Sequence, residues 1–162
     1  MSNDAHEKFM RVADRAAWLN QSRKFKTGGP FGACIVRRGK IIATSVNTVL
    51  IDKDPTCHAE INAIRAACDA LKTHDLRGCI LYTTCYPCPM CLSAAIWANI
   101  DTIYYGNTKE DAANIGFRDD TIYKLLEDPN SSPDITLKQL DRNTTIKLFD
   151  EFNSYADKDI RY

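Results

Sequence analysis

Hydrophobic residues recur every three or four positions between residues 4 and 25, which is the period of a helix with one buried face. The segment 32–46 has a different pattern, because two short β-branched runs there flank a tight-turn sequence at Arg38-Gly39. Gly28-Gly29-Pro30 separates the two patterns. The chain is therefore expected to begin with a helix followed by a β-hairpin.

An Ala-rich helix is predicted to begin near His58, directly after the loop sequence Asp54-Pro55-Thr56. A strand is expected at 79–84, a helix after Pro87 and another strand at 101–106. A strand, a helix and a strand in this order form a crossover unit, which places the two strands parallel in one sheet.

The pattern is weaker beyond residue 107. It predicts a short helix near 108–115, a strand at 135–140 and a last helix from Thr144. Together the elements predict a single domain over residues 1–162 with an α/β fold. We expect a three-layer αβα sandwich, in which helices cover both faces of a mixed sheet of about five strands.

Composition and charge narrow the possible partners. The chain has 162 residues, of which 44% are hydrophobic and 26% charged, as in an ordinary globular domain. Its formal net charge is zero, which argues against the basic field of a dedicated nucleic-acid-binding module. No stretch reaches the roughly 20 apolar residues that span a bilayer, and the first residues lack an apolar leader segment. We expect a soluble, cytoplasmic protein without a membrane or nucleic-acid partner.

Histidine and cysteine are spaced as metal ligands. Seven cysteines lie between residues 34 and 91 instead of joining distant segments, which favours thiols over disulfides. Cys88 and Cys91 are three residues apart at the start of one predicted helix, and His58 and Glu60 open another. One imidazole and two thiolates leave a zinc position open for water, as catalytic zinc sites do. The spacing predicts one zinc ion per chain, held by His58, Cys88 and Cys91.

Glu60 is the candidate proton carrier at this site. A carboxylate beside zinc can take a proton from the activated water and pass it to the substrate and the leaving group. The pattern His-x-Glu followed by Pro-Cys-x-x-Cys is typical of zinc-dependent base deaminases.

Other interpretations of the thiols remain open. Cys85, spaced evenly before Cys88 and Cys91, could close a Cys₃His shell around a structural zinc in a non-enzymatic module. An iron–sulfur cluster is disfavoured because no cysteine follows three residues after Cys91. We interpret Cys85 as a thiol near the metal and not on it. His6 and His74 have no ligand-spaced partner, so both are expected at the surface.

The chain resembles the cytidine and deoxycytidylate deaminase superfamily from about Phe9 to its C-terminus. Within this superfamily it is most similar to the bacterial guanine deaminases. The segments that carry this narrower similarity are Gly29 to Ala33, Asn47, Asp54 to Glu60, Cys85 to Cys91, Asp111 to Asp120 and Tyr162. The resemblance implies a cytidine deaminase-like fold and hydrolytic deamination of guanine to xanthine and ammonia, as in purine catabolism.

The resemblance also implies roles for individual residues. Glu60 would move protons, and Asp119 would meet the 2-amino group that leaves. Asn47 would hydrogen-bond the purine, and Phe31 and Trp97 would wall its pocket. By their own chemistry, Asn47 could equally be a turn residue, Asp119 a helix cap and Trp97 a core residue.

The resemblance further implies a homodimer in which the segment from about 144 to 162 crosses to the partner subunit. Tyr162 would then close the partner's active site. Tyr86 stands where many superfamily members have Glu, a departure at the rim of the site that bears on the substrate. Deamination of adenosine in tRNA, or of cytosine, cytidine or ammeline, remains an alternative because these enzymes share the zinc pattern.

Overall fold

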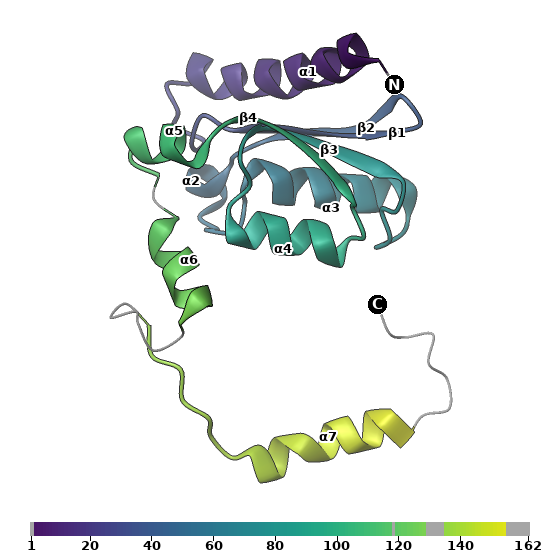
Figure 1. Cartoon of the computed structure of the whole chain (residues 1–162), viewed down its shortest axis with the longest axis vertical. Coiled ribbons are helices and arrows are strands. Elements are labelled where there is room, and N and C mark those ends of the chain that lie inside the picture. Colours follow the sequence, from purple (N-terminus) through teal and green to yellow (C-terminus); the bar gives the residue numbers. More distant parts are fainter. Residues whose placement is uncertain (1, 118, 129–134, 155–162) are drawn as a thin grey trace. The chain divides into compact units, whose positions relative to one another are not determined.

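The computed structural model describes residues 2–117, 119–128 and 135–154 (Figure 1). The chain divides into two compact units, residues 1–119 and 120–162, and each is described by itself. The helices and strands of the first unit are α1 (Asn3–Ser22), β1 (Gly32–Arg37), β2 (Lys40–Val46), α2 (Val49–Asp52), α3 (Ala59–Leu71), β3 (Cys79–Cys85), α4 (Pro89–Trp97), β4 (Thr102–Asn107) and α5 (Lys109–Asn114).

Four strands form one mixed sheet in the order β2-β1-β3-β4. The strand β1 pairs antiparallel with both β2 and β3, whereas β3 and β4 pair in parallel across the crossover helix α4. Arg38 and Gly39 connect β1 to β2 with φ angles of 51° and 74°. Two successive positive φ angles match the twist of a tight hairpin. The hairpin and the crossover unit therefore form where the sequence predicts them.

The sheet lies between two helical layers. Figure 1 shows α1 across one face and α3 with α4 across the other. On the α1 side, Phe9 and Ala13 pack with Cys34, Val36 and Tyr82. On the other side, a larger core joins α3 and α4 to the alternate positions of the same strands. This is the predicted three-layer αβα fold, because both faces of the central strands are buried.

The helix α1 lies unusually close to β1. A Cβ atom built on Gly32 would overlap the main-chain carbonyl oxygen of Ala13. Across the same layer, Tyr82 is fully buried, and its hydroxyl lies 2.7 Å from Nδ1 of His6. His6, which the sequence places at the surface, is therefore half-buried because it is the hydrogen-bond partner of a buried phenol.

The second unit contains α6 (Asp120–Glu127) and α7 (Arg142–Ser154). The predicted last helix is present, but the strand expected at 135–140 does not form. These residues make no strand pairing within the described parts of the chain, and Leu137 and Leu140 are exposed. Apolar alternation cannot create a strand without a neighbour to pair with. The sheet accordingly has four strands where about five are predicted. None of the described helices is long and apolar enough to cross a membrane.

Candidate active site

Two helix N-termini carry the predicted metal ligands. His58 is the N-cap of α3 and Cys88 is the N-cap of α4, and both have extended backbone angles. Pro89 occupies the first turn of α4, where its fixed φ suits a helix start. The first turn of a helix presents unpaired N–H groups and a partial positive charge, which stabilise a thiolate.

The three predicted donor atoms have the spacing that zinc requires. Nδ1 of His58 lies 3.6 Å from Sγ of Cys88 and 3.6 Å from Sγ of Cys91. For tetrahedral zinc with bonds of about 2.3 Å to sulfur and about 2.0 Å to nitrogen, the expected S···N separation is about 3.5 Å, close to the two distances here. All three donors lie within 4.8 Å of one another. The group therefore fits a zinc ion.

The electrostatics of the group favour thiolate ligands. Hydrogen bonds from Cys91 and His58 lower the pKa of the Cys88 thiol to about 4. The same contact with Cys88, together with burial, raises the pKa of the Cys91 thiol. The hydrogen bond with Cys88 also raises the pKa of His58. A bound divalent cation would favour ionisation of the second thiol as well.

Glu60 is buried beside these ligands. Its side chain is 6% exposed, its Oε1 accepts a hydrogen bond from the Thr83 hydroxyl at 2.8 Å, and its Oε2 lies 3.5 Å from Sγ of Cys91. Burial raises the pKa of the Glu60 carboxyl, and the hydrogen bond from Thr83 opposes this effect. A carboxyl group with a raised pKa can both accept and release a proton near neutral pH.

A small pocket of about 50 Å³ opens beside the metal ligands. The predicted residues Phe31, Asn47, Glu60 and Asp119 all line it. A larger groove of about 730 Å³ shares Phe31, Asn47 and His58 with the pocket and extends to Phe25. Because the groove and the pocket share these residues, the groove offers a substrate a route to the predicted metal ligands.

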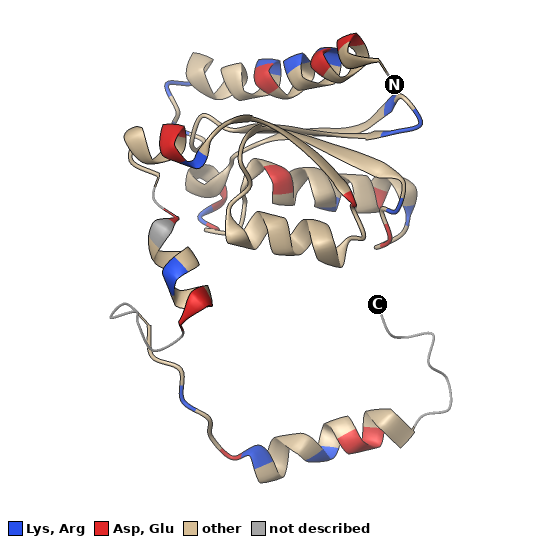
Figure 2. Ribbon diagram, in the orientation of Figure 1, with Lys and Arg blue, Asp and Glu red and all other residues tan. Residues whose placement is uncertain are grey.

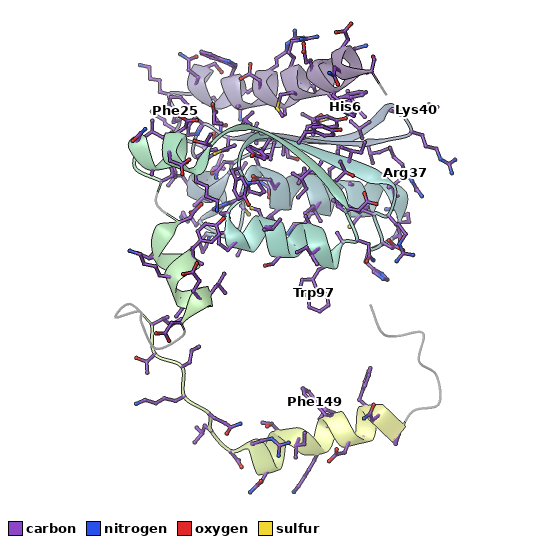
Figure 3. The ribbon with its side chains drawn as sticks, in the orientation of Figure 1. His6, Phe25, Arg37, Lys40, Trp97 and Phe149 are labelled. Atoms are coloured by element: carbon purple, nitrogen blue, oxygen red, sulfur yellow. The ribbon has the colours of Figure 1, made fainter. Side chains whose placement is uncertain are left out.

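One predicted wall residue does not line the pocket in the described part of the chain, and another predicted residue lies outside that part. Trp97 is the last residue of α4, is 65% exposed and points away from the body of the first unit (Figure 3). It follows Cys91 by six residues, or about 9 Å along a helix. Trp97 is therefore not among the described residues that line the pocket. Tyr162 lies outside the described residues.

Cys85 lines the pocket, but it is not part of the ligand group found in the described chain. Its thiol donates to the main-chain oxygen of Thr108 at 3.4 Å. A closed shell of three cysteines and one histidine is therefore not what this geometry offers.

Further pocket residues had no individual role in the sequence analysis. Phe117 stands edge-on to Phe31, with ring centroids 4.8 Å apart and an interplanar angle of 84°. The ammonium group of Lys109 lies 4.4 Å from the centre of the Tyr86 ring. Phe117 belongs to a segment singled out by resemblance, whereas no periodicity or spacing points to Lys109.

Comparison with known proteins agrees with this geometry. Residues 3–107 match the family model described as the cytidine and deoxycytidylate deaminase zinc-binding region. Guanine deaminase of Bacillus subtilis is 41% identical over 94% of this chain and 97% of its own length. The X-ray structure of a Bacillus subtilis guanine deaminase matches with a TM-score of 0.88 and 41% identity over 94% of this chain and 96% of that one.

A tRNA-specific adenosine deaminase of Aquifex aeolicus is 33% identical over 90% of this chain and 92% of its own length. The family match covers both ligand-bearing helix starts and all four strands. The chain therefore belongs to the zinc-binding cytidine and deoxycytidylate deaminase family.

Proposed function

We propose that this protein is a hydrolase that converts guanine and water to xanthine and ammonia. The observation that carries the proposal is the buried carboxyl of Glu60, 3.5 Å from Sγ of Cys91 in a group that fits zinc. The choice of guanine rests on the 41% identity to a guanine deaminase over nearly the whole of both chains.

His58, Cys88 and Cys91 would hold one zinc ion per subunit. When bound, zinc supplies a Lewis acid that makes water nucleophilic near neutral pH. Glu60 takes a proton from that water and delivers it to the ring nitrogen next to C2. A C–O bond forms at C2, and Glu60 then moves the second proton from the new C2 hydroxyl to the amino group, so that the C–N bond breaks, ammonia leaves and C2 becomes a carbonyl.

The other pocket residues hold the base. Phe31 and Phe117 offer apolar ring surface to a flat purine. Asn47 offers its amide for a hydrogen bond, and Asp119 offers a carboxylate to the amino group that leaves. Thr83 keeps Oε1 of Glu60 in place, so that Oε2 remains directed at the ligand group.

The second part of the proposal is a homodimer. Leu148, Phe149 and Phe152 are exposed on α7, and Trp97 is exposed on α4. Exposed apolar surfaces of this kind mark interaction sites. Exchange of the segment from about 144 to 162 between two copies would cover them and would bring Tyr162 to the partner's site. The seven thiols, none of which is paired in a disulfide, suit a cytoplasmic enzyme.

Deamination of adenosine in tRNA is the second candidate, since a tRNA-specific relative is similar over most of its length. The charge distribution disfavours it. Figure 2 shows acidic and basic residues interspersed along α1, and α4 carries no charged residue. A surface that binds the tRNA backbone would need a continuous basic face.

An ammonia-release assay with the zinc-loaded full-length protein tests the proposal. Guanine is expected to yield ammonia and xanthine in equal amounts, whereas adenine, cytosine, cytidine and ammeline yield little. Ammonia from tRNA but not from free guanine would contradict it. A gel shift with tRNA that persists at moderate salt would favour the second candidate.

A further inference from the structure

The amide group of Asn47 is fixed in one orientation. Asn47 follows β2 directly, is 3% exposed and lines the pocket beside His58. Its Oδ1 accepts hydrogen bonds from the main-chain N–H groups of Gly29 and Val49, both at 3.2 Å. A flipped amide would place Nδ2 against two donors. Asn47 therefore presents Nδ2, a hydrogen-bond donor, to a ligand.

Asn20, in α1, fixes the main chain around this amide from one side of the sheet. It is fully buried, and its Nδ2 donates to the carbonyl oxygens of Asn47 at 2.8 Å and Gly29 at 2.9 Å. Its Oδ1 accepts the hydroxyl hydrogen of Thr27. Both polar atoms of the Asn20 side chain are thus used: Nδ2 on Asn47 and on Gly29, which is one of the two donors to the Asn47 amide, and Oδ1 on Thr27.

Asn62, in α3, acts from the opposite face of the sheet (Figure 1). Its Nδ2 donates to the carbonyl oxygen of Val46 at 3.0 Å and to the hydroxyl of Thr48 at 2.8 Å. These residues precede and follow Asn47. We call Asn20 and Asn62 the asparagine clamp. A Cβ atom on Gly28 would overlap Oδ1 of Asn47, so the loop also packs directly against the amide.

We propose that the asparagine clamp consists of positioning residues that make the site select purines with a hydrogen-bond acceptor facing Asn47. The inference rests on the proposed function. Burying an amide is costly unless its hydrogen bonds are made, and Asn20 uses a fully buried one to hold two main-chain carbonyls beside the pocket. The acceptors on guanine that could meet Nδ2 are N7 and O6.

The test compares three 2-amino purines: guanine, 7-deazaguanine, which lacks N7, and 2-aminopurine, which lacks O6. Asn20→Leu keeps the side-chain volume similar and removes the donors. We expect it to lower kcat/KM for guanine about 10- to 100-fold, mainly through KM. The wild type should have a lower kcat/KM on the analogue that lacks the acceptor facing Asn47. On that analogue, Asn20→Leu should lower kcat/KM by less than a further factor of about three.

Equilibrium binding gives a second readout. Binding is measured in the Glu60→Gln variant, which should bind the bases without turning them over. Adding Asn20→Leu should raise the Kd of guanine and should change the Kd of the analogue without the acceptor much less. Asn62→Ala, at a partly buried position, repeats the experiment if Asn20→Leu does not fold. Leu76→Ala, at a fully buried core position outside the pocket, is the control for lost stability. It should change the Kd values of all three bases by the same factor.

Equal losses of kcat/KM for all three bases in Asn20→Leu and in Asn62→Ala would overturn the inference and leave the proposed function intact. Unchanged guanine kinetics in both variants would do the same. Absence of ammonia release from guanine by the wild-type protein would refute the proposed function, and the inference with it, before any variant is compared.

Discussion

Thr83 donates its hydroxyl hydrogen to Oε1 of Glu60 at 2.8 Å, and so joins the central strand β3 to the first turn of α3. Thr83 is itself fully buried. The contact leaves the second carboxylate oxygen of Glu60 to face the metal ligands. The orientation of the proposed proton carrier is therefore set by the sheet.

Replacing Thr83 by Val removes the hydroxyl and keeps the shape of the side chain. We expect kcat to fall about tenfold, because Glu60 loses the hydrogen bond that orients it. Zinc content should not change, since none of the three ligands contacts Thr83 in the described hydrogen-bond network. Steady-state kinetics and metal analysis of the same preparation check this, and unchanged kcat would refute the orienting role.

Glu60→Gln keeps the side-chain size but cannot carry a proton. Zinc binding should persist, while kcat falls by at least about 10² to 10⁴. Metal analysis and ammonia release measured together distinguish loss of the metal from loss of proton transfer. Near-wild-type turnover in a zinc-loaded variant would exclude Glu60 as the proton carrier.

Cys88→Ala should abolish both zinc binding and activity, because two remaining donors hold zinc weakly. Cys85→Ala is the matched control, since Cys85 is a pocket thiol whose hydrogen bond goes to Thr108. It should retain one zinc ion per chain. Zinc loss from Cys85→Ala would instead support the closed structural shell.

Gly32→Ala tests the close approach of α1 to β1. The added methyl group would overlap the carbonyl oxygen of Ala13, so the helix must shift. We expect the free energy of unfolding to fall by about 1–3 kcal/mol. Gln21→Ala, on the exposed side of α1, should change it by less than about 0.5 kcal/mol. Denaturant titrations of both variants give the comparison.

Tyr82 should make the fold sensitive to alkali. Burial raises the pKa of the Tyr82 phenol to about 12, above its usual value of about 10. The unfolded chain therefore releases this proton first, and the contribution of the neutral phenol to stability is lost as pH rises from about 10 to about 12. Tyr82→Phe should show a shallower decline of the unfolding free energy over that range. An identical decline in both proteins would contradict this.

The sequence predicts the metal group well because its determinants are local. His58 and Cys88 each begin a helix, and the spacing to Cys91 is one helical turn, so periodicity allows the group, while the pattern His-x-Glu followed by Pro-Cys-x-x-Cys identifies it. The αβα layers follow in the same way from the hairpin and the crossover unit.

Contacts between distant residues could not be predicted from pattern. His6 and Tyr82 are 76 residues apart, and the partner of a histidine is set by packing. Asn20 lies inside an amphipathic helix and only acquires its role through Asn47, which is 27 residues away. The strand expected at 135–140 does not form for a related reason, because a strand needs a neighbour to pair with, and local alternation does not encode that neighbour.

The zinc ligands and Glu60 stand on the opening turns of α3 and α4, whereas Phe31, Asn47 and Phe117 stand in connecting segments. In the proposed function, the hydrolytic residues thus stand on helix starts and the base-contacting residues in loops, and Asn62 of α3 links the two sets through the main chain next to Asn47. If the proposed roles hold, a laboratory effort to change the preferred nucleobase should begin with the loop residues Phe31 and Phe117, which lie on neither ligand-bearing helix.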